Sequence, residues 1–348
     1  MTNMLTTVRR MVVGVVAASL ALAAGCKKSD SAAVELKVSS YEPTVELYKA
    51  INPAFEKFYK AKTGKDIKAS TDHGPSGKQA RDIAAGKESD VAALSVDYDI
   101  DQIVKEGLID KEWRKRLPND AVPYYSAVVF MVRKGNPKGI KDWEDLARPD
   151  VKSLAPDPKT GGGARWIYLS TWAHALRKAR AEGKSDAEAE AAAREFTGKV
   201  YDDALLDPAM RQSTTTFVNR KEGDVLFGWE NEILQIVNDP RTKADYDVVL
   251  PSDSITIEVP IAIVDKVADK HKLREHAEEY VKFLYSEQGQ EIVAQYYNRP
   301  SNEKVAAKYK DRFPDLKLFK FKDHFSDWPA VMDKHFKTGA ILDQVRKK

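Results

Sequence analysis

Short apolar segments alternate with amphipathic segments along most of this 348-residue chain, and this alternation limits its fold more than any other feature. Residues 34–40 and 66–71 have the pattern of strands. Between them, residues 46–62 place their large apolar side chains on one face of a helix that Gly64 ends. Strands that alternate with helices in this way predict an α/β fold with largely parallel sheets.

Further segments continue the alternation. The strands and helices expected from their periodicity lie at residues 78–85, 91–95, 99–107, 127–133, 151–155, 164–180, 214–220, 224–228, 230–238, 248–250, 259–264 and 273–297. Residues 185–199 are rich in Ala and charged residues, and we expect a solvated helix there. Two successive α/β units, with the chain returning after the second, predict two lobes and a cleft. We expect one lobe from residues 34–125 and 259–348 and the other from residues 126–258.

The composition excludes several classes of protein. The chain has 56 Lys and Arg residues against 53 Asp and Glu residues, a net charge of +3, which argues against a dedicated nucleic-acid binder. Cys26 is the only cysteine, so neither an intrachain disulfide nor a cysteine metal cluster is expected. The six histidines form no HExxH motif, and we expect no metal and no cofactor.

The first residues have the pattern of a targeting segment. Residues 1–25 contain Arg9 and Arg10, then an apolar run too short to span a membrane comfortably. The small residues before Cys26 resemble the bacterial lipobox, which implies a lipoprotein signal peptide, a lipid anchor on Cys26 and a polar tether over residues 26–33. The alternative is a plain signal peptide beside an incidental cysteine.

Four loops rich in glycine or hydroxyl groups lie after a predicted strand or before a predicted helix. They cover residues 40–44, 74–78, 160–166 and 211–217. Helix N-termini expose N–H groups and the positive end of the helix dipole, so they bind anions. Together the loops predict an anion site, although each one taken singly is more often simply a helix cap or a tight turn.

Motifs for nucleotide binding and nucleophilic catalysis fail. In the second loop, Asp72 and Gln79 replace the first Gly and the final Ser or Thr of a phosphate loop. The chain contains no GxSxG motif. Trp229 follows an apolar strand, and its indole is either core packing or a donor-only group that faces the cleft.

Taken together, the loops resemble those of the periplasmic sulfate-binding proteins of ABC importers, over nearly the whole chain from Val34. The resemblance extends to thiosulfate-binding proteins and, more distantly, to molybdate-binding proteins. It is carried by SYEPTVELY at 40–48, HGPSGKQA at 73–80, GGARWIYL at 162–169, STTTFVNR at 213–220, GDVLFGWENE at 223–232 and SEQGQEI at 286–292. It implies the type II periplasmic-binding-protein fold, in which crossover hinge strands join two α/β lobes around a ligand cleft.

The resemblance also implies a set of ligand-binding residues. They are the main-chain N–H groups of Glu42, Ser76, Gly162, Gly163 and Met210, the indole of Trp229, and the position of Gly161. The family has a serine hydroxyl where this chain has Gly161, and Thr160 is the nearest replacement. Glu42 stands where the family usually has Asp, and Arg211 is expected to pair with it.

The family resemblance and the lipobox together imply a monomeric extracytoplasmic protein, lipid-anchored to a membrane, that captures sulfate and delivers it to an ABC permease. A cage made only of donors suits sulfate, whereas hydrogen phosphate carries a proton that needs an acceptor. Thiosulfate, molybdate and phosphate, the last with Glu42 as acceptor, are the alternative ligands. An exported enzyme acting on a small anion is the other class, with a base chosen among Glu42, Asp72 and His73.

Overall fold

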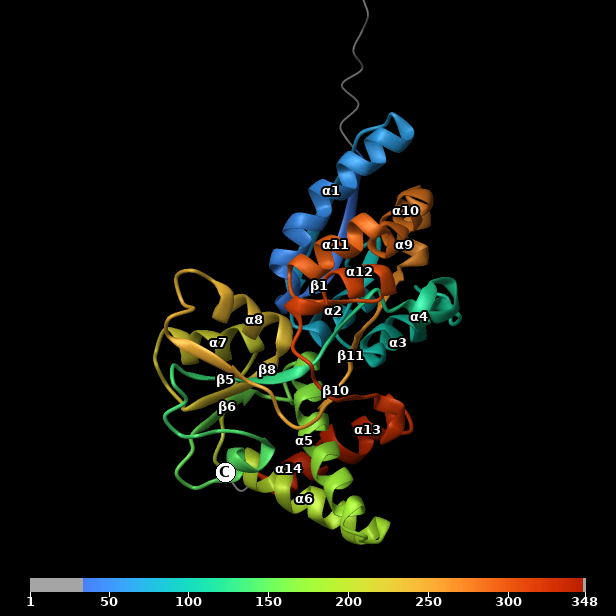
Figure 1. Cartoon of the computed structure of the whole chain (residues 1–348). Coiled ribbons are helices and arrows are strands. Elements are labelled where there is room, and N and C mark those ends of the chain that lie inside the picture. The colour runs from blue at the N-terminus through green and yellow to red at the C-terminus, as the bar shows by residue number, and fades with distance from the viewer. Residues whose placement is uncertain (1–33, 347–348) are drawn as a thin grey trace, which may run out of the picture. The chain divides into compact units, whose positions relative to one another are not determined.

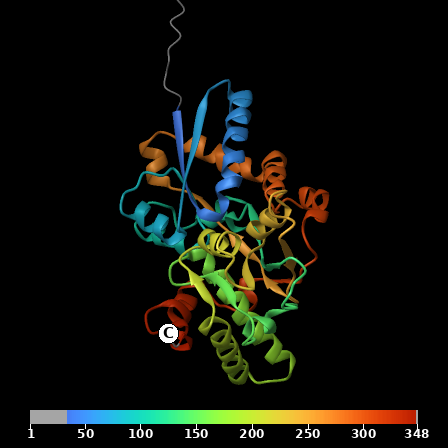
Figure 2. The ribbon, with the colours of Figure 1, turned by 90° about the vertical axis from the view of Figure 1, so that its left-hand side faces the viewer.

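The first sheet is built from the N-terminal strands of the chain in the computed structural model, which describes residues 34–346. Strand β1 (Val34–Tyr41) lies between β2 (Ile67–Gly74) and β3 (Val91–Ala93) and is parallel to both, as Figure 2 shows for the blue pair β1 and β2. Strand β12 (Ile261–Ile263) adds antiparallel to β3. The expected signal segment, the tether and Cys26 lie outside the described residues.

Helices from both ends of the chain pack on this sheet or on one another beside it. They are α1 (Val45–Thr63), α2 (Ser76–Ala84), α3 (Asp97–Lys105), α9 (Asp265–Lys270), α10 (Arg274–Tyr285), α11 (Glu287–Gln295) and α12 (Glu303–Lys308). In α1 the apolar stripe Leu47, Ile51 and Phe55 is fully buried. The helix ends at Gly64, which takes the left-handed conformation with φ of 73°, as a C-terminal glycine commonly does.

The second sheet has the order β7-β6-β8-β5-β9 and mixes strand directions. Its strands are β5 (Val128–Arg133), β6 (Ser153–Pro156), β7 (Leu205–Asp207), β8 (Val225–Trp229) and β9 (Tyr246–Val249). Strand β5 is antiparallel to β8 and β9, while β6 is parallel to β7 and β8, so the sheet is less parallel than predicted. Its helices are α5 (Gly162–Ala181), α6 (Asp186–Asp202), α7 (Met210–Val218) and α8 (Glu230–Asn238).

Each of the two larger sheets, with the helices that pack on it, therefore forms one α/β lobe. Figure 1 shows α1 and α11 near β1, and α7 and α8 near β5 and β8. The chain passes from β4 (Tyr124–Ser126) into β5, and returns through β10 (Ser254–Ile255) and β11 (Ile257–Val259). Two small sheets complete the arrangement, one pairing β11, β4 and β13 (Arg299–Pro300) and the other pairing β10 with β14 (Leu318–Phe319).

The structure divides two segments that the sequence predicts as continuous. The strand expected at 259–264 breaks at Pro260, because β11 pairs with β4 whereas β12 pairs with β3. The helix expected at 273–297 breaks at Ser286, whose hydroxyl accepts from Gly289 N and caps α11. The helix expected to be solvated is α6, and it buries Ala189 and Ala193.

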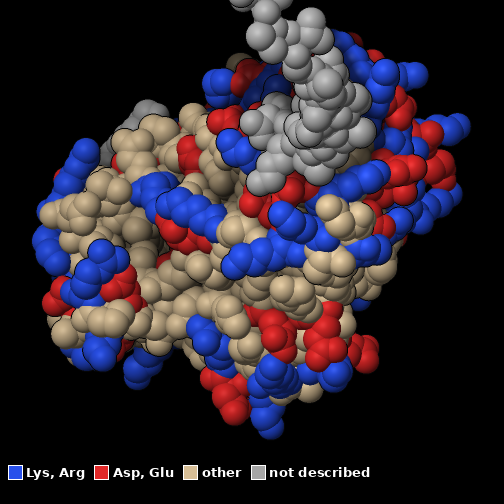
Figure 3. Space-filling view, turned by 90° about the horizontal axis from the view of Figure 1, so that it is seen from above, with Lys and Arg blue, Asp and Glu red and all other residues tan. Residues whose placement is uncertain are grey.

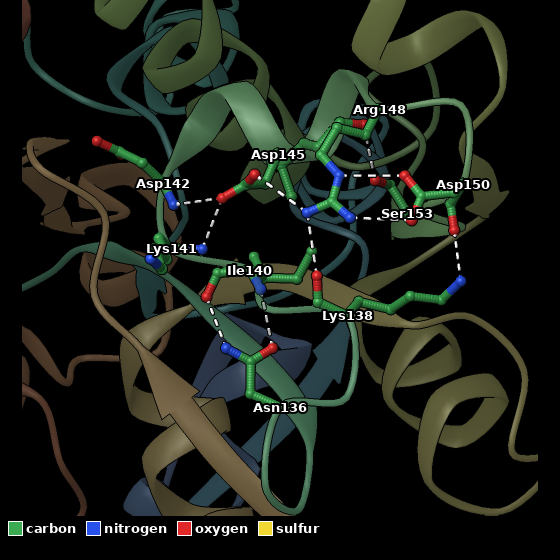
Figure 4. A network of polar contacts seen from close by, with 10 residues as sticks. Asn136, Lys138, Ile140, Lys141, Asp142, Asp145, Arg148, Asp150 and Ser153 are labelled. Atoms are coloured by element: carbon green, nitrogen blue, oxygen red, sulfur yellow. Dashed lines mark hydrogen bonds and ion pairs between the residues drawn. The ribbon is translucent and has the colours of Figure 1, made fainter.

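Short helical turns fill several connections. They are η1 (Glu42–Thr44), η2 (Trp113–Arg116), α4 (Pro118–Ala121), η3 (Trp143–Ala147), η4 (Lys310–Arg312), η5 (Phe321–Asp323) and η6 (Met332–Phe336). Around η3, side chains hold the connection from β5 to β6 (Figure 4). Asp145 accepts from the main-chain N–H of Lys141 and Asp142, and Arg148 bridges Asp145 and Asp150. In this irregular segment, the side chains thus supply hydrogen bonds that a regular strand or helix would form between main-chain groups.

The last helices of the chain are α13 (Trp328–Val331) and α14 (Ile341–Val345). Helix α14 contacts α6, and α13 contacts α3. The rings of Trp328 and Trp166 meet edge to face, with centroids 5.0 Å apart. Lys159 Nζ donates to Phe336 O and Asp343 Oδ2 at 2.9 and 2.8 Å. Residues 328–345 therefore pack largely on the second lobe, while α13 also contacts α3 of the first.

Charged side chains of both signs are mixed on the face that Figure 3 shows. This mixture agrees with the nearly balanced numbers of basic and acidic residues in the sequence. Within residues 34–346, none of the helices combines the length and apolarity needed to cross a membrane.

Candidate functional site

Seven residues that the sequence places in a ligand site line one cavity. They are Glu42, Ser76, Gly161, Gly162, Gly163, Met210 and Trp229. The cavity has a volume of about 30 Å³. Roughly 10–15 Å³ of such space holds one water, whereas drug-sized ligands occupy pockets of about 300–1,000 Å³. The cavity therefore suits a ligand with few heavy atoms.

Three helices, α2, α5 and α7, begin at this cavity. Their N-cap residues Pro75, Gly161 and Ala209 also line it, and none of the three provides a side-chain cap. The first N–H groups of an α-helix have no acceptor within the helix. They point out of its positive end, which favours negative charge. The N–H groups of three helices are therefore directed at one small space, as an anion site requires.

The two glycines that open α5 lie too close to their neighbours to carry a side chain freely. A Cβ on Gly162 would lie 2.7 Å from Ser95 Oγ and 2.9 Å from Asp99 Oδ2. A Cβ on Gly163 would lie 3.2 Å from the Trp229 ring. Glycine at these positions lets the α5 main chain approach the opposite wall of the cavity.

Trp229 is the last residue of β8 and is fully buried. Its indole Nε1 donates to Gly163 O at 3.0 Å. The indole therefore lines the cavity, and its N–H is held by a main-chain carbonyl. A bound oxyanion would have to replace this carbonyl as the acceptor.

Thr160 does not replace the hydroxyl that the family has at Gly161. Its Oγ1 donates to Pro208 O at 2.6 Å and to Asp157 O at 3.1 Å, and Thr160 does not line the cavity. Gly161 itself has φ of −112°, and a Cβ there would make only ordinary contacts at 3.6 Å and beyond. The position therefore accepts a side chain.

Glu42 is the only charged residue among the described residues that line the cavity. Burial raises the pKa of its carboxyl, and Arg211 opposes this shift. Arg211 forms its ion pair with Glu232, at 3.6 Å from Nε to Oε1, and not with Glu42 as expected. Sequence reasoning missed Glu232, whose only signal is its place in the WENE segment directly after Trp229.

Asp99, on the wall opposite α5, is a second residue that sequence reasoning missed. The Ser76 hydroxyl donates to Asp99 Oδ2 at 2.6 Å and accepts from Ser95 N at 3.0 Å. Arg165 lies 3.8 Å from Asp99 Oδ1. Burial raises the pKa of the Asp99 carboxyl, and Arg165 opposes this shift. The side chain of Ser76 is thus fully engaged, which leaves its main-chain N–H for a ligand.

The other candidate bases lie outside the cavity lining. Asp72 accepts from Lys87 and Gln79 at 2.5 and 3.0 Å, and the hydrogen bond from Lys87 is the main cause that lowers its carboxyl pKa. Burial lowers the pKa of the His73 imidazole. Of the three, only Glu42 lines the cavity. Across residues 34–346, no group of three or more His, Cys, Asp or Glu residues is placed to hold a metal ion.

Comparison with known proteins gives relatives over most of the chain. Residues 36–297 match the family described as bacterial extracellular solute-binding protein. The sulfate-binding protein of Escherichia coli (strain K12) is 45% identical over 316 residues, which cover 90% of this chain and 94% of that protein. The thiosulfate-binding protein of Pseudomonas aeruginosa is 41% identical over 308 residues, 88% of this chain and 90% of that protein.

Solved structures show the same architecture. The sulfate-binding protein SubI from Mycobacterium tuberculosis H37Rv superposes with a TM-score of 0.75 at 30% identity, covering 87% of this chain and all of that chain. A periplasmic thiamin binding protein superposes with a TM-score of 0.61 at 16% identity, covering 90% of this chain and 95% of that chain. The second likeness extends to the fold alone.

Proposed function

Because the chain belongs to the bacterial extracellular solute-binding proteins, we propose that it captures sulfate outside the cytoplasm and delivers it to an ABC importer. The similarity to sulfate-binding proteins at 45% and 44% identity supports this ligand. These relatives are binding proteins and not enzymes. The proposed function therefore needs a site that holds a small dianion without changing it.

The observation that carries the proposal is that three helices without side-chain caps begin at one small cavity. Removing a dianion from water is costly unless other hydrogen bonds replace its hydration. Hydrogen bonds to a charged group contribute about 1.5–3 kcal/mol each. Several N–H groups directed at one space can supply these bonds without a Lys or Arg side chain.

We propose as ligands the groups that the family resemblance implies. They are the main-chain N–H groups of Glu42, Ser76, Gly162, Gly163 and Met210 and the indole N–H of Trp229. The convergence of these residues on one cavity supports the set. The bond from Trp229 to Gly163 O means that ligand binding must reorient one of these two groups.

Thiosulfate is the second candidate ligand, since it offers the same oxygen acceptors. Two thiosulfate-binding relatives, 41% and 39% identical, favour it. Phosphate is less suited, because its proton requires an acceptor. Glu42 is the only carboxylate among the described residues that line the cavity, and burial raises its pKa, which favours the protonated form that can donate.

Isothermal titration with sulfate, thiosulfate, phosphate and molybdate tests the proposal. We expect sulfate or thiosulfate to bind the unmodified protein more tightly than phosphate does. Trp229→Phe keeps the ring and removes the N–H, so it should weaken the preferred anion by about 1–3 kcal/mol. Failure of the unmodified protein to bind any of the four anions would overturn the proposal.

We further propose that Cys26 carries a lipid anchor and that the chain works as a monomer at a membrane surface. The small residues before this single cysteine support the anchor, and two or more acyl chains are enough for stable attachment. Labelled palmitate should enter the natural chain in its bacterial host and be absent from Cys26→Ser. Label in the variant would contradict the anchor.

For the lobe boundaries, we propose residues 34–125 and 259–327 for the first lobe, and residues 126–258 together with the last helices for the second. The contact of α14 with α6 and the ring contact of Trp328 in α13 with Trp166 in α5 support moving residues 328–345 to the second lobe, although α13 also contacts α3 of the first. Limited proteolysis that releases residues 328–345 while α5 and α6 stay protected would contradict this division.

A further inference from the structure

We propose that the Ser95 hydroxyl is a ligand-binding donor of this cavity and replaces the hydroxyl that is missing at Gly161. No motif in the sequence marks Ser95, and the family resemblance assigns it no role. The inference rests on the proposed function, because it names a further group that holds the same oxyanion.

The main chain of Ser95 is fixed from two sides. Ser95 directly follows Leu94 beyond the end of β3, and its side chain is fully buried. Its N–H donates to Ser76 Oγ at 3.0 Å, and its carbonyl accepts from Trp166 Nε1 at 2.7 Å. These partners lie on α2 and α5, the helices whose N-termini form two walls of the cavity. Ser95 is therefore held in place at the cavity without using its hydroxyl.

The Ser95 hydroxyl itself has no hydrogen-bond partner, although it is buried. A buried hydroxyl without a partner lowers stability, so such groups are uncommon and call for a cause. Ser95 lines the cavity, and its Oγ lies 2.7 Å from the position that a Cβ on Gly162 would take. The hydroxyl thus lies beside the first residue of α5, where the main-chain N–H groups of that helix point at the same space.

An oxyanion in the cavity would give this hydroxyl its missing acceptor. A hydroxyl that donates to a charged oxygen forms a short, strong bond. It can also rotate to meet the ligand, which a main-chain N–H cannot do. The opposite wall therefore supplies the side-chain donor that Gly161 lacks.

Titration of Ser95→Ala with sulfate and thiosulfate tests the inference. We expect the affinity for the preferred anion to fall by about tenfold to a hundredfold, the loss of one bond to a charged group. Ser39→Ala is the matched control, because Ser39 is also buried with an unpartnered hydroxyl but does not line the cavity. It should bind as the unmodified protein does.

Adding Gly161→Ser to Ser95→Ala should restore part of the lost affinity, since the Gly161 position has room for a side chain. If Ser95→Ala does not fold, Ser95→Cys keeps the size, offers only a weak donor and should show the same loss. Binding by a folded Ser95 variant as tight as that of the unmodified protein would overturn the inference and leave the proposed function intact. Failure of the unmodified protein to bind any oxyanion would overturn both.

Discussion

Glu232 holds its carboxylate where water barely reaches it. Its side chain is 6% exposed and its Oε2 has no hydrogen-bond partner. Burial raises the pKa of this carboxyl to about 7, Arg211 opposes the shift, and Glu42 adds to it. The folded protein therefore keeps a proton on Glu232 in a pH range where the unfolded chain has lost it.

This shift predicts that stability falls as pH rises. When the pKa of an acid is higher in the folded state, the acid does not affect stability at a pH below its ordinary pKa. As pH rises from the ordinary pKa to the raised one, the acid destabilises the folded state increasingly. For Glu232 this window runs from the ordinary value of 4.5 to about 7, and the loss is about 3 kcal/mol. Glu232→Gln should therefore raise the free energy of unfolding at pH 8 and change it much less at pH 4.5.

Urea unfolding of the variant and the unmodified protein at both pH values measures this difference. Glu195→Gln is the control, since Glu195 is exposed and paired with Lys199 on the surface of α6. It should leave the free energy of unfolding nearly unchanged at either pH, because exposed ion pairs contribute little. An equal effect of Glu232→Gln at pH 4.5 and pH 8 would show that Glu232 does not titrate in this window.

The residues of the site differ in how far the sequence could predict them. Gly162, Gly163 and Trp229 stand in recognisable segments, so the resemblance indicated them, and the structure brings them to one cavity. Glu232 lies in such a segment, but nothing in the segment marks its side chain, and Ser95 lies outside all of them. Their importance comes from burial and missing partners, which depend on how α8 and β3 pack and not on neighbouring residues in the chain.

At the scale of an element, the N-terminus of α5 offers a prediction about its glycines. Gly162→Ala would place a Cβ 2.7 Å from Ser95 Oγ, closer than real contacts allow. Forced contacts of this kind typically cost about 1–3 kcal/mol. We expect a loss of stability in this range and weaker binding of the preferred oxyanion.

Gly161→Ala is the matched control one residue earlier. There a Cβ meets its nearest neighbour at 3.6 Å, and φ is −112°, which any residue adopts. Thermal unfolding and titration of both variants should separate them clearly. Equal stability of the two variants would mean that the wall around Ser95 yields to a methyl group.

Periodicity predicted most helices and strands because apolar stripes record which face of an element is buried. It missed the breaks at Pro260 and Ser286, since apolar residues continue on both sides of each. At Pro260 the chain leaves the sheet that contains β4 and joins the sheet that contains β3. This change depends on pairing with strands that are distant in the sequence. At Ser286 the helix α10 ends, and the Ser286 hydroxyl caps the N-terminus of a new helix, α11.

At the scale of the whole molecule, the alternation of strands and helices predicted the α/β class but not the order of strands. Strand order places β12, from late in the chain, beside β3 in the first sheet. Such pairings join segments far apart in the sequence, and local pattern carries no information about them. Because of such pairings, the chain crosses twice between the two larger sheets.

A buried ion pair joins two such distant segments. Arg299, in β13, donates to both carboxylate oxygens of Glu230, the first residue of α8, at 2.7 Å each. Glu230 is fully buried. Burial raises the pKa of its carboxyl, and Arg299 opposes the shift. The pair therefore links the second lobe to the strand that follows α11 in the first.

Removal of Arg299 should destabilise the protein strongly, because it leaves a buried carboxylate without a partner. Breaking a buried pair in this way typically costs about 3–5 kcal/mol, whereas replacing both members together is often neutral. Arg299→Met should therefore lower the free energy of unfolding by several kcal/mol at pH 8. The double variant Arg299→Met with Glu230→Gln should recover much of the loss.

The dependence on pH separates lost charge pairing from lost packing, since Arg299 also lies over the Phe313 ring. Without Arg299 the pKa of Glu230 rises further, so the folded state takes up a proton that the unfolded chain does not hold above its ordinary value of 4.5. The cost of Arg299→Met should then shrink as pH falls toward 4.5. Urea unfolding across this range measures it, and a cost that stays constant with pH would assign the loss to packing on Phe313 instead of to the charge on Glu230.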